Sequence, residues 1–241
     1  MHKNIHNSDV PRLCQSCEAR HRGICGVLRP EELAELSKHS RQITHKAGEE
    51  LIGDSEPVTT YANVMHGVVK LTKMLEDGRQ QVVGLQFAPD FLGRLFSDQS
   101  KLTAEAASEV ELCRFPKPAI ENLIADNPSL EHELLEQTLQ ELDEAREWMV
   151  TLGRKTAAEK VSSFLYSIAI HIDPKIERDQ ADSTTIDLPL TRADIADLLG
   201  LTVETVSRQL TKLRTDKIIE ITNNRHLTIP HLGRLKNRCG G

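Results

Sequence analysis

The chain has 241 residues, of which 39% are apolar, and a formal net charge of −6. This length suits two domains, and the absence of any apolar run approaching ~18 residues excludes a membrane-spanning helix. The first thirty residues also lack the apolar stretch of a signal peptide, so we expect a cytoplasmic protein with no membrane partner.

Three cysteines lie close together near the N-terminus. Cys14, Cys17 and Cys25 form the pattern C-x2-C-x7-C, and Cys113 follows much later. Three thiolates in so short a segment are typical of an iron–sulfur or other soft-metal centre, which takes four cysteine sulfurs. Cys113 can provide the fourth only if the fold returns the N-terminal segment to it. A zinc site is one alternative, because C-x2-C is the commonest half of a four-ligand zinc motif. Another is that the thiols are unrelated or form a disulfide, although disulfides do not persist in reducing cytosol.

Residues 41–116 show short apolar stretches separated by turn residues. We expect strands at residues 50–52, 61–65, 68–73, 80–87 and 110–115. Residues 76–79, Glu-Asp-Gly-Arg, have the composition of a tight hairpin turn. Many short strands with frequent turns indicate a sandwich or barrel rather than a parallel sheet.

A long helix is predicted over residues 129–153, with a nearly heptad spacing that is typical of a dimer seam. The seam consists of Leu135, Leu139, Leu142, Arg146, Met149 and Leu152. Arg146 interrupts its apolar character, and we expect the flanking Glu136, Glu141, Glu144 and Glu147 to crowd negative charge along the interface. The alternative is a helix that packs on its own sheet.

Residues 190–214 have the sequence of a helix-turn-helix. They follow a helix predicted from residue 155 to about 171 and an irregular loop over residues 173–185. Thr191 is a good N-cap for the first helix, Gly200 favours the left-handed backbone that ends it, and Thr202 caps the second helix. The second helix of such a motif enters the major groove of DNA. Two short strands at residues 218–222 and 226–229 then form a β-wing, so we expect a winged helix.

Side chains of the second helix suit nucleic-acid recognition. Glu204, Ser207 and Arg208 share its outward face. Arg208 can bind guanine, Glu204 can accept from cytosine, and Ser207 can serve a base or a phosphate. Residues placed to contact phosphates are Thr205, Lys212 and Arg214. Residues 201–241 carry 8 Lys and Arg against 3 Asp and Glu, whereas residues 1–150 carry 16 against 25, so the basic end is the part that suits a polyanion.

The predicted strands, long helix and winged helix, in this order, resemble the Crp/Fnr family of bacterial transcription regulators. The cysteines and the Glu204-x-x-Ser207-Arg208 face make the chain similar to the oxygen-responsive Fnr branch. Residues 68–72 and 201–208 resemble its alphaproteobacterial FnrL, FnrN and FixK-like members. The resemblance implies an α+β fold: an N-terminal β-roll sensor domain (cupin-like, of the cyclic-nucleotide-binding type), a long dimerisation helix and a C-terminal winged helix-turn-helix. The expected domain limits are 1–30 for a cluster-binding segment, 31–128 for the sensor, 129–153 for the helix and 154–241 for the DNA-binding domain.

The resemblance also implies a cofactor and partners. It assigns a [4Fe–4S] cluster, assembled when oxygen is scarce, to Cys14, Cys17, Cys25 and Cys113. Members of this branch dimerise, bind double-stranded DNA at a palindrome resembling TTGAT-N4-ATCAA and recruit RNA polymerase to activate transcription. The chain departs from the best-known enterobacterial member by a longer spacing between its second and third N-terminal cysteines. Cys239 lies outside the pattern and is expected to be a bystander.

Other functions are less well supported by the residues. A cyclic nucleotide needs an Arg followed by Ser or Thr, whereas residues 102–107 contain Glu105 and no Arg, with Arg94 too far upstream, so we expect no cyclic nucleotide. His39, His45 and His66 are scattered, which argues against haem. The sequence contains no G-x-S-x-G or H-E-x-x-H motif that would indicate an enzyme. A zinc-stabilised or redox-responsive DNA-binding regulator without an iron–sulfur cluster remains the alternative.

Overall fold

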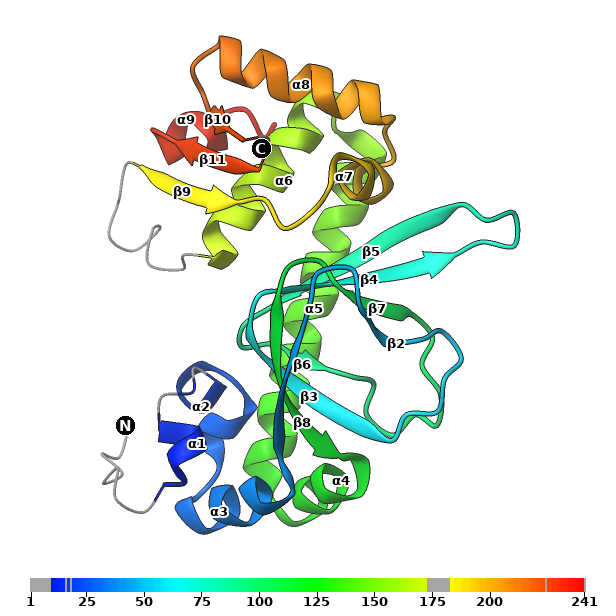
Figure 1. Ribbon diagram of the computed structural model, residues 1–241, viewed down its shortest axis with the longest axis vertical. Coiled ribbons are helices and arrows are strands. Elements are labelled where there is room, and N and C mark those ends of the chain that lie inside the picture. Colours follow the sequence, from blue (N-terminus) through cyan, green and yellow to red (C-terminus); the bar gives the residue numbers. More distant parts are fainter. Residues whose placement is uncertain (1–9, 16, 18, 173–182, 224, 241) are drawn as a thin grey trace. The chain divides into compact units, whose positions relative to one another are not determined.

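The computed structural model describes residues 10–15, 17, 19–172, 183–223 and 225–240 (Figure 1). Contacts divide the chain into two compact units. The first contains the chain up to Lys73 together with Val83–Leu142, and the second contains Met74–Val82 and the chain from Asp143 onward. No helix among the described residues is long and apolar enough to cross a membrane.

The first unit begins with short helices that pack on a β-sheet. They are α1 (Arg12–Gln15), α2 (Ala19–Arg22), the 3-10 helix η2 (Ile24–Val27) and α3 (Pro30–His39). Ile24, Leu28 and Leu33 are at most 3% exposed, and they join the same core as Phe115 of the sheet. Burying each such side chain contributes about 1.5–3 kcal/mol. Helices this short are unstable alone, so this packing is what holds the segment in place.

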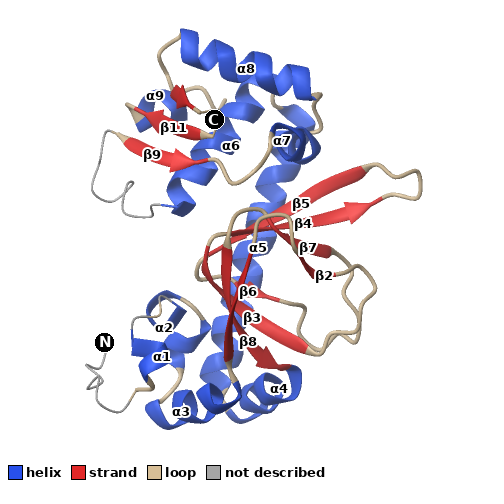
Figure 2. Ribbon diagram, in the orientation of Figure 1, coloured by secondary structure: helices blue, strands red, loops and turns tan. Residues whose placement is uncertain are grey.

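Two four-stranded sheets form a β-roll (Figure 2). The strand order is β1-β8-β3-β6 in one sheet and β2-β7-β4-β5 in the other. The strands are β1 (Arg41–His45), β2 (Glu50–Ile52), β3 (Thr60–His66), β4 (Val68–Met74), β5 (Gln80–Phe87), β6 (Phe91–Leu92), β7 (Thr103–Ala106) and β8 (Val110–Pro116). Val64, Val69 and Leu112 are almost fully buried and belong to the core that the strands of the roll enclose.

The five strands expected in this region are present as β2, β3, β4, β5 and β8. Strands β1, β6 and β7 were not predicted. β1 is mostly exposed at a sheet edge, β6 has two residues, and β7 has the sequence Thr-Ala-Glu-Ala. None of them has the apolar pattern that indicates a strand. Pairing with neighbouring strands, which sequence patterns do not reveal, makes them extended.

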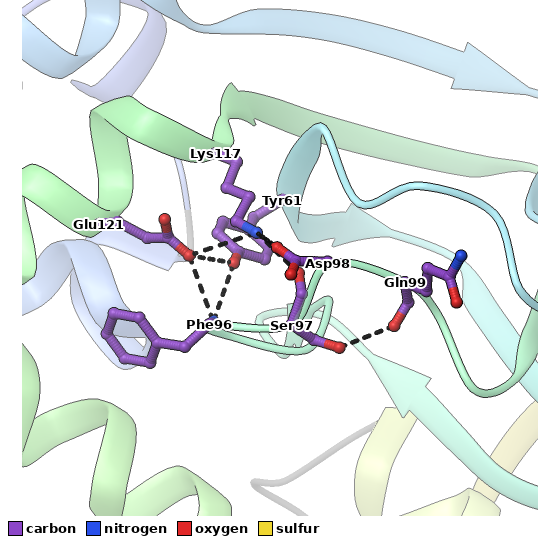
Figure 3. A network of polar contacts seen from close by, with 7 residues as sticks. All are labelled: Tyr61, Phe96, Ser97, Asp98, Gln99, Lys117 and Glu121. Atoms are coloured by element: carbon purple, nitrogen blue, oxygen red, sulfur yellow. Dashed lines mark hydrogen bonds and ion pairs between the residues drawn. The ribbon is translucent and has the colours of Figure 1, made fainter.

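A polar network holds the loop that follows β6 (Figure 3). Phe96 has a left-handed backbone, with φ 55°, which a bulky residue rarely adopts. Its N–H donates to Tyr61 Oη and to Glu121 Oε1, both at 3.2 Å, and Tyr61 Oη donates to the same carboxylate at 2.8 Å. Lys117 Nζ donates to the Ser97 carbonyl at 2.7 Å. These bonds offset the cost of the unfavourable backbone conformation.

Two helices complete the first unit, α4 (Lys117–Asp126) and the start of α5 (Pro128–Arg154). The Asn127 side chain caps α5, because its Oδ1 accepts from the N–H groups of Ser129 and Leu130 at 3.0 and 3.1 Å. Leu130 and Leu134 are buried and pack this end of α5 into the core that also contains α3 and α4. The long helix predicted over residues 129–153 is therefore present as α5.

The second unit contains the winged helix-turn-helix. Its elements are α6 (Ala157–Ile172), β9 (Thr184–Asp187), α7 (Arg192–Leu199), α8 (Val203–Thr215), β10 (Glu220–Thr222), β11 (His226–Ile229) and α9 (Leu232–Lys236). Phe164, Leu165 and Ile168 of α6 are fully buried and provide the centre of its core. The end of the β4–β5 hairpin belongs to this unit, because Gln80 Nε2 donates to Asp197 Oδ2 at 2.7 Å and Gln81 Nε2 donates to the Leu198 carbonyl at 3.1 Å.

The wing has one more strand than expected. Its sheet has the order β10-β11-β9, and β9 begins inside the stretch predicted as an irregular loop over residues 173–185. That part of the loop prediction was wrong. Thr184 and Ile186 are buried and alternate with exposed Thr185 and Asp187, but four residues are too few for this alternation to indicate a strand. Residues 173–182 of the predicted loop lie outside the described residues.

Candidate metal centre and nucleic-acid interface

The structure brings the four predicted cysteines to one pocket in the first unit. Cys14 lies in α1, Cys17 between α1 and α2, Cys25 in η2 and Cys113 in β8, and all four line the pocket. Cys25 and Cys113 are buried, whereas Cys14 and Cys17 are half-buried. The fold therefore does return the N-terminal segment to Cys113.

Sheet pairing and core packing position the two buried thiols. Cys113 pairs with Gln42 of β1 and with Asn63 of β3. Cys25 is placed by its neighbour Ile24, which is fully buried. The apolar side chains that line the same pocket include Leu33, Leu36 and Phe115. The sulfurs of Cys25 and Cys113 thus lie in an environment with little access for water.

Burial controls the protonation of these thiols. Burial raises the pKa of Cys25, nearby Cys113, Cys17 and Cys14 raise it further, and a hydrogen bond with Asn63 lowers it. Burial also raises the pKa of Cys113 to about 12, and burial followed by the charge of Cys17 raises the pKa of Cys14. The thiols affect one another's pKa because they are close in space. The raised pKa values keep the thiols of Cys14, Cys25 and Cys113 protonated near neutral pH, so a bound metal has to displace those protons.

The thiols surround the pocket without converging on one point. Among the residues that the structure describes, no three His, Cys, Asp or Glu side chains form a group that could hold a metal ion. A zinc site needs four ligand atoms at about 2.0–2.3 Å from one ion. In a [4Fe–4S] cluster each cysteine sulfur binds a different iron, so the donors can be further apart. Four cysteine sulfurs that line one pocket have the donor chemistry that a [4Fe–4S] cluster requires. All five cysteines are free, so the disulfide alternative is not realised.

The other candidate ligands lie elsewhere. Cys239 belongs to the second unit, where its sulfur contacts the Leu235 carbonyl at 3.4 Å. His39 is next to Glu35 in α3, His45 contacts Glu49, and His66 is exposed at the end of β3. None of these side chains lines the cysteine pocket.

The helix-turn-helix in the second unit has the predicted caps. Thr191 Oγ1 accepts from the Asp194 N–H at 3.1 Å, and the Asp194 carboxylate accepts from the Thr191 N–H at 3.0 Å. Gly200 ends α7 with φ 61°, a conformation that favours glycine. Thr202 Oγ1 then accepts from the Thr205 N–H at 3.2 Å, which begins α8. Helix α7 therefore begins and ends, and α8 begins, where the local sequence predicts.

The predicted DNA-reading side chains lie on the exposed side of α8. Glu204, Ser207 and Arg208 are exposed, as are Lys212 and Arg214 further along the helix. Within the part of the chain that the structure describes, no ion pair is found for Arg208, Lys212 or Arg214. The opposite side of α8, with Val206, Leu210 and Leu213, is buried. The orientation of α8 thus leaves the basic and polar side chains available to a ligand.

Val203 and Thr205 lie in the first turn of α8. Thr205 accepts a hydrogen bond at 3.0 Å from the Thr202 hydroxyl and so takes part in the cap, and its contact with phosphate stays a prediction. Val203 was not included in the predicted contact set, yet it is 44% exposed beside Glu204 at the start of α8. An exposed apolar side chain at this position can contact the methyl group of thymine. Its exposure, which depends on packing, could not be read from the local sequence.

The predicted seam of α5 is exposed. Its apolar members Leu135, Leu139, Leu142, Met149 and Leu152 are between 36% and 71% exposed, and Val150, at 58%, was not predicted. The Arg146 guanidinium contacts Asp143 of the same helix at 3.0 Å. The alternative of a helix that packs on its own sheet holds for the other side of α5, where Leu130 and Leu134 are buried in the core of the first unit, but not for the seam.

The flanking glutamates do not all face the seam. Glu141 lines a cavity of the β-roll and lies 3.5 Å from Gln86 Nε2, and Glu144 lies 3.5 Å from His171 Nε2. The expectation that four glutamates crowd the interface stays a prediction, and contacts within the chain involve two of them.

The cavity between β-roll and α5 bears on cyclic-nucleotide binding. It has a volume of about 600 Å³. Arg94 and Lys101 line it, whereas Glu105 does not and instead pairs with Lys70 at 2.9 Å. The expectation that Glu105 would place a carboxylate against the ligand was therefore wrong, whereas Arg94 lines the cavity although it lies upstream of the expected position. The absence of this ligand stays a prediction.

Comparisons with known proteins match both parts of the chain. Residues 159–238 match the Crp-like helix-turn-helix domain, and residues 42–127 match the cyclic nucleotide-binding domain. A Rhizobium leguminosarum bv. viciae protein named "Probable transcriptional activator" is 51% identical over 94% of this chain and 93% of its own length. The transcriptional activator protein FnrL of Cereibacter sphaeroides is 39% identical over 96% and 95%. The structure of FixK2 from Bradyrhizobium japonicum matches with a TM-score of 0.72 and 31% identity, over 83% of this chain and 96% of that one.

A β-roll followed by a long helix and a winged helix-turn-helix defines a class of DNA-binding regulators that carry a sensor domain. Identity of this extent over nearly the whole chain then settles the family. The chain belongs to the Crp/Fnr family and is a transcriptional activator of the FnrL and FixK type rather than an enzyme.

Proposed function

We propose that this protein is an oxygen-responsive activator that holds a [4Fe–4S] cluster on Cys14, Cys17, Cys25 and Cys113. The observation that carries the proposal is the arrival of all four cysteines, from three elements and the segment between α1 and α2, at one pocket. A chain selected only for stability has no reason to gather four free thiols there, two of them buried. When bound, the cluster supplies an oxygen-labile centre.

The residues around the pocket have separate roles. The four cysteines, as thiolates, would hold the irons. Leu33, Leu36 and Phe115 keep water away from the sulfurs, and the buried neighbour Ile24 keeps η2 on the sheet. Cys14 and Cys17 lie in a segment of very short helices, so bonds to the cluster would add stability to a region that has little of its own.

The same proposal assigns DNA reading to α8. Arg208 would bind guanine in each half of a TTGAT-N4-ATCAA-like palindrome, with Glu204 and Ser207 contacting neighbouring bases. Lys212 and Arg214 would neutralise phosphates, and Val203 would meet a thymine methyl group. A palindrome requires two copies of the chain, which the exposed apolar side of α5 would provide by pairing with the same side of a second copy. RNA polymerase would then be recruited beside the bound dimer.

Anaerobic purification tests the proposal directly. The protein should be straw-brown, with about four irons and four sulfides per chain, and should bind a TTGAT-N4-ATCAA duplex. Exposure to air should bleach the colour and weaken binding to this duplex together. A colourless protein that contains stoichiometric zinc and binds DNA equally in air would instead support the zinc-stabilised regulator.

A further inference from the structure

A buried amide lies directly beside the cysteine pocket. Asn63 is 1% exposed in β3, where it pairs with Cys113 of β8 on one side and with Phe91 of β6 on the other. Its Nδ2 donates a hydrogen bond to the Cys25 sulfur at 3.4 Å. Its Oδ1 is buried and has no hydrogen-bond partner in the part of the chain that the structure describes. Asn63 therefore contacts one cysteine through its side chain and another through its strand.

The stability of the sheet does not explain this residue. A buried polar group without a partner costs about 1–3 kcal/mol, and asparagine is disfavoured in strands. The adjacent residues Ala62 and Val64 are buried and apolar, as expected for a central strand. An apolar residue of similar size at position 63 would avoid the cost, so the benefit of Asn63 has to come from its contact with sulfur.

Two other uncharged polar side chains near the pocket use their protons elsewhere. A hydrogen bond with Ser40 lowers the pKa of Cys113, but the Ser40 hydroxyl has one proton and donates to the Leu36 carbonyl at 2.7 Å. The Gln42 amide lines the pocket and donates to Met65 Sδ at 3.4 Å. The amide of Asn63 has two N–H groups and no charge. It can therefore donate to a sulfur without the desolvation cost of a buried cation.

We propose that Asn63 is a positioning residue of the cysteine pocket, whose amide donates a hydrogen bond to the Cys25 thiolate and stabilises that thiolate as an iron ligand. This inference rests on the proposed function, because it needs Cys25 to bind iron. A metal-bound thiolate has no proton and can only accept, and a hydrogen bond to a charged acceptor is roughly twice as strong as one between neutral groups. The contact is therefore weak in the free protein and strong once iron is bound.

Three variants test this role. Asn63→Leu removes the donor with little change in size, and Asn63→Gln keeps the amide on a longer side chain. Gln86→Leu is the matched control, since Gln86 is also a buried amide of the β-roll with an unpartnered oxygen, but it lines the separate cavity of the roll. Each protein is loaded with iron and sulfide without oxygen. Loss of iron to a ferrous chelator and the energy of the sulfur-to-iron charge-transfer bands are then measured, together with the thermal midpoint of the iron-free protein.

Asn63→Leu should lose iron roughly 10-fold faster than wild type, which is typical when a partner of a metal ligand is removed. Its charge-transfer bands should move to lower energy, because a sulfur without the hydrogen bond holds its electrons less tightly. The rate of iron loss and the band energies of Asn63→Gln should lie nearer to those of wild type than those of Asn63→Leu do, and those of Gln86→Leu should equal the wild-type values. The iron-free Asn63→Leu protein should be as stable as wild type or more so, which a purely structural role for Asn63 would not produce.

The outcomes separate the two proposals. Equal iron loss and equal bands in Asn63→Leu and wild type overturn the inference alone. If Asn63→Leu loses iron faster but its iron-free form also has a lower thermal midpoint, the faster loss reflects a less stable fold. That result also overturns the inference and leaves the proposed function intact. A wild-type protein that takes up no iron overturns the proposed function and the inference with it.

Discussion

At the scale of single residues, the position of a cysteine in the fold decides its expected role. Cys113 is buried in β8 and lines the pocket with Cys14, Cys17 and Cys25, whereas Cys239 lies in the second unit beside the Leu235 carbonyl. The spacing C-x2-C-x7-C marked the first three as ligands. The pairing of β8 with β3 then placed the fourth beside them, which no local pattern could show.

Replacing these two cysteines provides a matched test. Cys113→Ser should abolish the visible absorbance of anaerobically loaded protein and its preference for the palindrome, because one iron would lose its thiolate. Cys239→Ser should leave both unchanged. Absorbance spectra and iron content of the two variants, prepared side by side, check this. Full cluster content in Cys113→Ser would contradict the assignment of four ligands.

The exposed residues of α8 make a second test at this scale. Arg208→Ala should weaken binding by about 1–3 kcal/mol per half-site and relax the preference for guanine at one base pair. Lys212→Ala should weaken binding to all sequences alike and reduce the dependence on salt, because a phosphate contact releases counterions without reading a base. Titrations with the palindrome and with base-substituted duplexes at several salt concentrations distinguish the two. An unchanged base preference in Arg208→Ala would remove this residue from the reading set.

At the scale of elements, α5 shows how packing divides one helix into two functional faces. Leu130 and Leu134 are buried in the core of the first unit, while Leu135, Leu139 and Leu142 remain exposed. Heptad spacing predicted which residues form the exposed seam. It did not predict that Glu141 and Glu144 would be turned towards Gln86 and His171, because such contacts join residues far apart in the chain.

A charge placed in the seam should separate the proposed dimer. Leu139 is 51% exposed, and burying a leucine contributes about 1.5–3 kcal/mol. Since each subunit contributes one copy, Leu139→Glu should raise the dimer dissociation constant at least about 100-fold. Gln140→Glu adds the same charge at the neighbouring exposed position and is the matched control. Sedimentation of iron-loaded proteins measures the change, and an unaltered dimer in Leu139→Glu would place the interface elsewhere.

At the scale of the whole molecule, the candidate cysteine site and the DNA-reading helix belong to different units. The cysteine pocket lies in the first unit and α8 in the second, and α5 contributes residues to both. In the proposed function, α5 is the element through which a signal from the pocket is expected to reach the DNA-binding part. That helix also carries the exposed seam, so cluster binding and dimerisation are expected to be coupled.

Two copies of α8 should read half-sites about one turn of DNA apart, with centres about 10 base pairs from each other. Inserting about half a turn between the half-sites would place the second one on the opposite side of the duplex. Binding of iron-loaded protein to that duplex should fall to the level of a duplex with a single half-site. Titrations of the three duplexes measure this, and equal affinity for the original and the lengthened palindrome would exclude a rigid dimer.

Short-range sequence alone specifies the parts that depend on neighbouring residues. Thr191 and Gly200 bound α7, Thr202 begins α8, and the heptad leucines define the seam of α5, because caps and periodic faces need only a few consecutive side chains. The tertiary structure decided the rest. It created β1, β7 and β9 by pairing, placed Cys113 and Asn63 side by side with Cys25, and turned Glu105 away from the cavity of the roll. These features join residues that are distant in the chain, and only the packed fold brings such residues into contact.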